Sequence, residues 1–301
     1  MRSTGEVLHG YVTAQVRQIE GQETGVRTGA TDAVHKMRVA ARRLRSVLVT
    51  YRRAVEAGRV DTLAAELTWL TGALGEARDS EVVLDRLAEL LAEQPDELVA
   101  GPVSHRLHLE LDGRLAAGRA VAVEALDSPR YEALRQELDS FVATPPLAAS
   151  AAGDAARQLP QPLARVLRRL DVRMRKVEQA DIAEDRERLL HGVRKSAKRL
   201  RYAAELTSTV IGSEASAVAD IATTLQEILG QHHDSVVTRA ALRTLAEEAE
   251  LHGESAFTYG RLHALEELRA AALEDDYDAA AHQVPAPSVV AGWERLAGVA
   301  G

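Results

Sequence analysis

The sequence predicts an all-α protein, on three observations. Apolar residues recur at the 3.6-residue spacing of helices in almost every segment, while the alternation typical of strands is scarce. Only 3% of the 301 residues are aromatic, and alanine and leucine dominate the apolar set, as in helical bundles rather than sheets. Short segments rich in Gly, Pro and small polar residues separate the long periodic stretches. We therefore expect helices throughout the chain.

The breaks between these stretches predict how the chain is divided. They fall at residues 20–32, 93–102, 143–162 and 211–214. The third break is rich in Pro, Ala and Ser, a composition typical of a linker. We expect a first helical half at 1–145, a linker at 146–160, a second helical half at 161–280 and a tail with one short helix at 281–301.

The two halves carry the same motifs in the same order, which indicates an internal repeat. HKMRVAARRLR begins at His35, and HGVRKSAKRLR begins at His191. LGEARD follows in the first half and LGQHHD in the second. RLHLEL at 106–111 matches RLHALEEL at 261–268 when one residue is inserted. Each pair is separated by 155 or 156 residues, so we interpret the halves as homologous.

Composition excludes several classes of protein. The chain has no cysteine, which excludes disulfides and thiolate metal sites. No apolar run approaches the roughly 20 residues that span a membrane, and the N-terminal segment lacks a signal-peptide core. We expect a soluble cytoplasmic protein without membrane contact. The formal net charge of −8 argues mildly against a general nucleic-acid coat, but the basic residues are segregated and create a local field.

The basic residues gather on two amphipathic helices. With 100° per residue, one histidine and three cations of each motif fall within about 80° of one another, opposite an apolar stripe. These faces consist of His35, Arg38, Arg42 and Arg45 in the first motif and of His191, Arg194, Lys198 and Arg201 in the second. The adjacent cations Arg43 and Arg199 complete the candidate set. Acids that would relieve the repulsion are almost absent, so the pattern predicts a polyanion ligand.

Further candidates lie outside the two motifs. The stretch 165–176 precedes the second motif, and its Arg165, Arg168 and Arg169 are candidate contacts with the anion. His108 and His263 match across the repeat and could add charge as the pH falls below about 6.5. Guanidinium groups match phosphate oxygens, and no aromatic residues interleave with the basic helices to stack on bases. A ligand of phosphates without bases, such as inorganic polyphosphate, fits this pattern.

The motif H-x-x-R-x-x-x-[RK]-[RK]-L-R, present twice and followed each time by L-G-x-x-x-D, resembles the CHAD domain, the conserved histidine α-helical domain. The resemblance covers residues 5–280. It implies two homologous antiparallel four-helix bundles, related by pseudo-twofold symmetry, with a basic channel between them that binds polyphosphate. The matching motif positions become the lining of that channel. The E-x-E-x-K motif of a triphosphatase domain fused to some relatives is absent.

We therefore predict a stand-alone binding protein without catalysis, cofactor or metal, associated with polyphosphate granules. Motifs for nucleotide binding, zinc proteolysis and serine hydrolysis are absent. Two alternatives stay open: a nucleic-acid-binding scaffold that uses the same basic faces, and a metal-dependent phosphohydrolase built on His232, His233 and Asp234. The repeat weakens the second alternative, because the residue equivalent to His233 is Arg78. Protein partners are not indicated.

Overall fold

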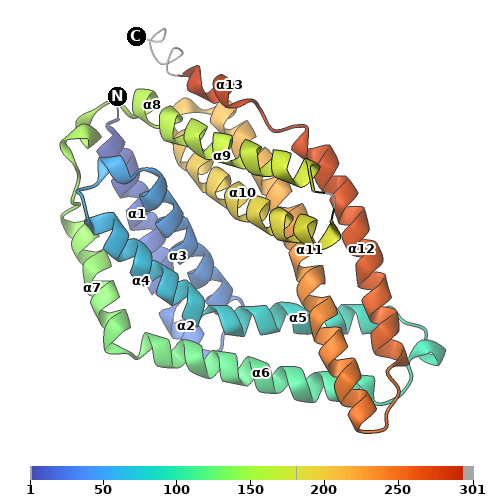
Figure 1. Cartoon of the computed structure of the whole chain (residues 1–301). Coiled ribbons are helices and arrows are strands. Elements are labelled where there is room, and N and C mark those ends of the chain that lie inside the picture. Colours follow the sequence, from blue (N-terminus) through green and yellow to red (C-terminus); the bar gives the residue numbers. More distant parts are fainter. Residues whose placement is uncertain (1, 181, 294–301) are drawn as a thin grey trace.

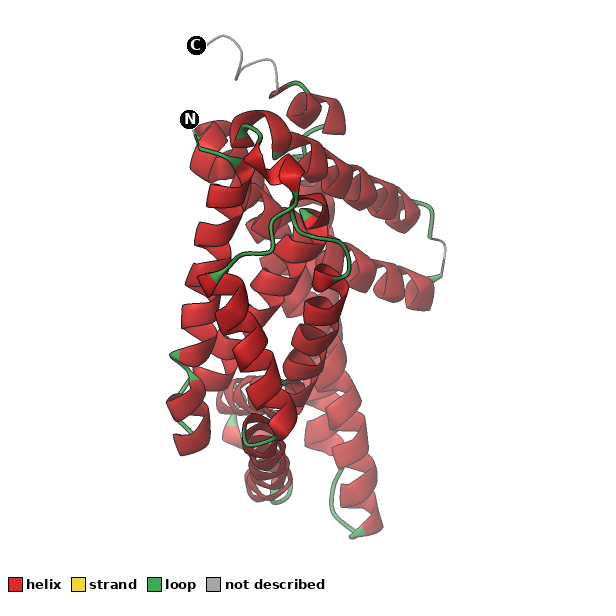
Figure 2. Ribbon diagram, turned by 90° about the vertical axis from the view of Figure 1, so that its left-hand side faces the viewer, coloured by secondary structure: helices red, strands yellow, loops and turns green. Residues whose placement is uncertain are grey.

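The computed structural model describes residues 2–180 and 182–293, without the side chains of residues 76–78, 110–112, 183 and 184. Every regular element in this part of the chain is a helix, apart from two isolated β-bridges (Figure 1, Figure 2). The all-α prediction is therefore confirmed. Among the described helices, none is long and apolar enough to cross a membrane.

The helices of the first half run up and down one side of the molecule, with α5 and α6 reaching across to the other (Figure 1). Their bounds are α1 Thr4–Glu20, α2 Glu23–Thr28, α3 Ala33–Thr50, α4 Arg59–Ala73, α5 Gly75–Ala92, α6 Val103–Leu126 and α7 Pro129–Ala143, with 3₁₀ turns η1 Arg52–Ala54 and η2 Asp96–Leu98.

The second half contains the longest helices of the molecule's described part. Their bounds are α9 Pro160–Glu178, α10 Ala183–Ile211, α11 Ser213–Leu251, α12 Phe257–Ala281 and α13 Pro287–Ala291. α9 packs on α10, α10 on α11, and α11 on α12. A single glycine, Gly212, separates α10 from α11, and its φ of 88° is a conformation that residues with a Cβ rarely adopt.

Local sequence signals set where several helices begin. Ser3 and Glu6 form a capping box at α1: the Glu6 amide donates to Ser3 Oγ, and the Ser3 amide donates to the Glu6 carboxylate. Ser128 caps α7, and the following Pro129 occupies the first helical position, where its missing N–H costs nothing. These caps satisfy backbone donors that the helix itself leaves unpaired.

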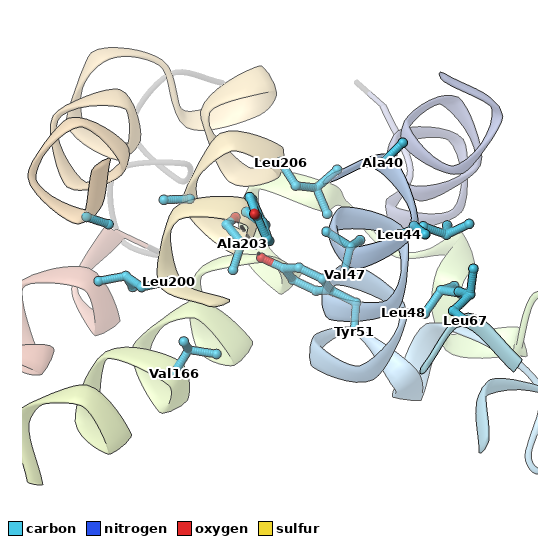
Figure 3. Packing of buried hydrophobic residues seen from close by; sticks show 14 of the residues in the cluster. Ala40, Leu44, Val47, Leu48, Tyr51, Leu67, Val166, Leu200, Ala203 and Leu206 are labelled. Carbon is cyan, nitrogen blue, oxygen red and sulfur yellow. Dashed lines mark hydrogen bonds between the residues drawn. The ribbon is translucent and has the colours of Figure 1, made fainter. Parts of the chain in front are cut away.

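One hydrophobic core crosses the boundary between the predicted halves. It contains the apolar faces of α1, α3 and α4 together with those of α9, α10 and the first part of α11. In Figure 3, Tyr51, the residue directly after α3, reaches across to Ala203 of α10. Its buried hydroxyl lies 3.1 Å from the Ala203 carbonyl oxygen and 2.9 Å from Thr207 Oγ1. The apolar stripes of α3 and α10 thus hold the two basic helices together, and the polar faces of both helices lie on the same side of this contact.

A second, smaller core lies where α5 and α6 reach the far ends of α11 and α12. It contains Leu87 of α5, Leu107 of α6, Leu245 of α11 and Tyr259 of α12. The helix pair α5–α6 therefore packs on the pair α11–α12, its counterpart in the predicted repeat. The ion pair between Arg86 of α5 and Glu266 of α12, 2.6 Å, spans the same contact.

The stretch 146–160 is packed rather than extended. It contains the 3₁₀ turn η3 (Ala149–Ala152) and the short helix α8 (Ala155–Gln158). Ser150 Oγ donates to the Arg53 carbonyl oxygen at 2.7 Å, and the Ala155 amide donates to the Arg2 carbonyl oxygen at 3.1 Å. These bonds fasten the connection to the first half. The division into two bundles and their pseudo-twofold relation stay predictions.

Candidate functional site

The basic faces of α3 and α10 line two neighbouring cavities, which we call the central cavities. The first, about 450 Å³, also touches α11 at residues 226–234. The second, about 460 Å³, also touches α4 at residues 68–72. Both cavities are lined by the same four cations, which we call the central cations: Arg38, Arg42, Arg194 and Lys198. Because two come from each motif, the structure brings the cores of both predicted faces together.

The central cations are held in an unfavourable environment for charge. Burial, followed by repulsion from the surrounding arginines, lowers the pKa of Lys198 from 10.5 to about 7. Burial also lowers the pKa of Arg42 and Arg194; neighbouring arginines add to the effect, while Asp234 opposes it at Arg194. Among the described residues, no carboxylate forms an ion pair with these three cations. A group of desolvated cations that Asp234 offsets only in part destabilises the empty protein and favours an anionic ligand.

The remaining motif cations are partly neutralised by the protein itself. Arg38 pairs with Asp79 at 2.9 Å. Arg43 and Arg201 share the carboxylate of Glu205, at 3.3 and 2.8 Å, and both line the first central cavity. Arg45 lines the second and donates to Thr68 Oγ1 at 2.9 Å. Arg42, Arg194 and Lys198 therefore have no ion pair with a described residue, and the ion-paired or hydrogen-bonded arginines, Arg38 among them, lie around these three.

The motif histidines lie in different cavities. His35 lines the first, whereas His191 lines the second and packs against His233 of α11, with ring centroids 4.6 Å apart. Burial is the main cause that lowers the pKa of both His191 and His233, the latter to about 4, and nearby cations add to it. Both rings are therefore neutral at pH 7 in the empty protein. The buried Nδ1 of His191 has no hydrogen-bond partner in the described part of the chain.

The third basic stretch lies beside the central cavities. Arg165 and Arg169 of α9 line a cavity of about 720 Å³ next to η1, and together with Arg168 they line another of about 690 Å³ between α9 and α10. Arg199 lines both of these and the second central cavity. The predicted contacts on α9 are thus close to those on α10.

The structure places His108 and His263 elsewhere. His108 is exposed on α6, and its Nδ1 lies 2.6 Å from the Ser104 carbonyl oxygen. His263 of α12 lies 3.8 Å from Glu267 on the same helix. Neither histidine lines any of the cavities described above, because α6 and α12 diverge from the basic helices toward the smaller core.

The residues of the metal-site alternative face different neighbours. His232 is buried with its Nε2 3.3 Å from Glu274 of α12, whereas His233 points toward His191. Asp234 lines the first central cavity. Within the described residues, no group of three or more histidines and carboxylates could hold a metal ion. The side chain of Arg78, the repeat equivalent of His233, lies outside the described residues.

Comparison with known proteins identifies the family. The family model for the CHAD domain matches residues 10–243. The chain belongs to the CHAD domain family. Two uncharacterized proteins of Mycobacterium tuberculosis, MT2285 of strain CDC 1551 and Rv2226 of strain H37Rv, are each 36% identical over 256 residues. That match covers 85% of this chain and 48% of each relative, so the chain spans about half the length of these curated relatives.

Two solved structures share the CHAD fold. The CHAD domain from the plant Ricinus communis is 29% identical, with a TM-score of 0.73 over 95% of this chain and 93% of that one. PptA from Streptomyces chartreusis is 21% identical, with a TM-score of 0.76 over 94% of this chain and 100% of that one. At 21% identity, the likeness to PptA shows the fold alone.

In this CHAD protein, the cavities also include residues that motif spacing missed. Tyr202 lines both central cavities, Lys195 lines the second, and Arg53 and Arg173 line the cavities beside α9. Lys195 lies about 40° from His191 on the helical wheel, so a wider arc would have included it. Tyr202 carried no comparable signal in the sequence. In the structure the Arg43 guanidinium lies over its ring, 5.4 Å from the ring centroid.

Proposed function

We propose that this protein binds inorganic polyphosphate in the central cavities without catalysis of its own. The observation that carries the proposal is the group of central cations, drawn from both motifs, of which Arg42, Arg194 and Lys198 have no ion-pair partner in the described part of the chain. Phosphate oxygens would replace the water that these groups lose on burial, and would stabilise their charged forms. The CHAD resemblance implies the same ligand.

A chain of phosphates fits the cavities better than a nucleic acid. Readers of single-stranded nucleic acid stack bases on accessible aromatic side chains. Tyr202 is the one aromatic residue, other than histidine, that lines either central cavity, and it is 3% exposed. The site therefore offers positive charges, and its described lining has no exposed aromatic platform for bases.

The surroundings also favour binding over hydrolysis. His232 is occupied by Glu274, and the neutral His191–His233 pair lies among cations that oppose binding of a metal cation. We further propose that the protein acts in the cytoplasm, at polyphosphate granules. Co-localisation of a fluorescent fusion with stained granules, lost in a granule-deficient strain, tests this location.

The central test compares three forms of the full chain in titrations with polyphosphate of about 100 phosphates. R42Q/K198Q removes two central cations. R175Q/R188Q is the matched control, because it removes two exposed arginines that pair with Asp171 and Asp185 and line none of the cavities. We expect the central variant to lose at least about 100-fold in affinity and the control about twofold or less, since each contact between a cation and phosphate contributes about 1.5–3 kcal/mol.

Two competing ligands complete the test. DNA of matched charge should bind more weakly than polyphosphate at the same salt concentration. Equal or tighter binding of DNA, or equal losses in the central and control variants, would contradict the proposal. Release of phosphate from polyphosphate with added Mg²⁺ or Mn²⁺ would overturn the non-catalytic part of it.

A further inference from the structure

A groove on the outside of the second half carries six cations and no acid. It runs between α9 and α10, has a volume of about 690 Å³, and we call it the outer groove. Its cations are Arg165, Arg168, Arg169, Arg173, Lys176 and Arg199. The other lining residues are aliphatic or small: Val166, Val172, Leu189 and Ser196. The groove therefore offers positive charge and apolar walls, but no ring on which a base could stack.

The charges of the outer groove differ from those on the rest of the same helices. Arg175 of α9 pairs with Asp171, and Arg188 and Arg186 of α10 pair with Asp185 and Glu274. None of the six groove cations forms an ion pair with a described residue. On these two helices, the three cations that line neither the groove nor the central cavities are thus all ion-paired, whereas the six that face the groove are not.

One groove cation is held against the backbone of the neighbouring helix. Arg173 Nη1 donates to the Gly192 carbonyl oxygen at 3.0 Å. A Cβ at position 192 would lie 3.0 Å from this nitrogen, so glycine leaves room for the guanidinium. The first motif has Lys36 at the equivalent position. Glycine at position 192 therefore leaves room for an arginine from α9.

Arg199 borders both the outer groove and the second central cavity. This side chain lines the second central cavity, the outer groove, and the intermediate cavity that also contains Arg53, Arg165 and Arg169. Its pKa is lowered by partial burial and then by Arg169, Arg45 and Arg173. Cations that line the second central cavity and cations that line the groove thus act on the same guanidinium.

We propose that a polyphosphate chain bound in the central cavities continues past Arg199 into the outer groove, so that the groove gives the protein its preference for long chains. The inference rests on the proposed function, because the groove extends that site. A chain that occupies both regions gains the second set of contacts without a second loss of translational freedom. A short chain that fills the central cavities gains nothing from the groove.

The test uses two chain lengths and three variants of the full protein. Tripolyphosphate reports on the central cavities, and polyphosphate of about 100 phosphates reports on both regions. R168Q/K176Q removes two exposed groove cations, R42Q/K198Q removes two central cations, and R175Q/R188Q is the charge-matched control on the same two helices. Each variant is checked for helix content and thermal midpoint before titration at fixed salt.

We expect R168Q/K176Q to bind tripolyphosphate within about twofold of wild type and the long chain at least about tenfold more weakly, as for a lost tethered contact. The central variant should lose affinity for both lengths. The inference is overturned if R168Q/K176Q loses affinity for both chain lengths equally, or if its affinities match those of R175Q/R188Q. It is also overturned if, in a parallel titration, this variant loses affinity for single-stranded RNA alone, which would make the groove a nucleic-acid surface. If wild type binds neither length, the proposed function itself fails. If R168Q/K176Q binds the long chain as tightly as wild type while R42Q/K198Q does not, the proposed role of the groove is wrong and the proposed function stands.

Discussion

Lys198 shows at the scale of one residue why the site requires a ligand. Its ammonium group lies among Arg38, Arg42 and Arg194, and the attraction of Asp234 is too weak to offset burial and repulsion. With a pKa of about 7, the amine is half neutral at physiological pH in the empty protein. An anion in the central cavities stabilises the ammonium form and must therefore raise this pKa.

This linkage predicts proton uptake on binding. At pH 8 the free protein holds Lys198 largely neutral, so binding of long-chain polyphosphate should take up about one proton per protein. Calorimetry in buffers of different ionisation enthalpy measures the number. K198R is the control, because arginine stays charged at pH 8 in both states. The same uptake in K198R would show that another group takes the proton.

Lys198 should also lower the stability of the empty protein in a pH-dependent way. Its folded pKa of about 7 lies below the unfolded value of 10.5, so the penalty is complete below pH 7 and fades as pH rises toward 10.5. K198M should raise the free energy of unfolding at pH 6 by on the order of 1–2 kcal/mol, since it removes a buried unpaired charge. Urea unfolding at pH 6 and pH 9.5 measures both values. A gain that does not shrink at pH 9.5 would contradict the assignment.

At the scale of the helix, the sequence predicted the site where helical periodicity alone decides it. Arg38, Arg42, Arg194 and Lys198 fall on one face of α3 or α10 by the 100° rule, and the structure places that face toward the cavities. The same rule could not place His108. Where it lies depends on the direction of α6 relative to α3, which is a property of tertiary packing.

The repeat likewise predicted matching helices but not their continuity. LGEARD and LGQHHD are equivalent in sequence, yet the first lies at the junction of α4 and α5, whereas the second lies in the middle of α11. The break lets α5 turn away from α4 and cross to the second half. Both motifs carry a glycine at the same place, and neither Gly75 nor Gly230 has a positive φ. The glycine therefore does not distinguish the helix break in the first half from the continuous helix in the second.

The contact between α3 and α10 makes a prediction at this scale. Tyr51 hydrogen-bonds across the two helices to Ala203 and Thr207, so Y51F should lower the free energy of unfolding by about 1 kcal/mol. The affinity for polyphosphate should be little changed, since Tyr51 lines none of the described cavities. Y11F is the matched control: the buried Tyr11 hydroxyl has no partner in the described part of the chain, so its loss should be neutral or stabilising. Equal losses in both variants would contradict the role of this bond.

At the scale of the whole molecule, the acidic average and the basic site belong together. Acids neutralise cations over most of the surface, as in Arg130–Glu66, Arg106–Glu254 and Arg135–Glu132. By contrast, Arg42, Arg194 and Lys198 of the central cavities and the six cations of the outer groove form no ion pair with a described residue. A net charge of −8 therefore repels polyanions from most of the chain while the site attracts them, which favours one register of binding over a diffuse coat.

This segregation predicts how binding depends on salt. The logarithm of the affinity for long-chain polyphosphate should fall linearly with the logarithm of salt concentration, by about 0.7 per phosphate that the protein neutralises, as for single-stranded nucleic acids. R42Q/K198Q and R168Q/K176Q should each reduce the slope by about 1.4, because each removes two contacts. R175Q/R188Q changes the net charge equally but removes ion-paired arginines, so its slope should match wild type. Titrations between 50 and about 400 mM NaCl measure the four slopes. If all three variants lower the slope alike, the ligand senses the average field of the protein rather than the cavities.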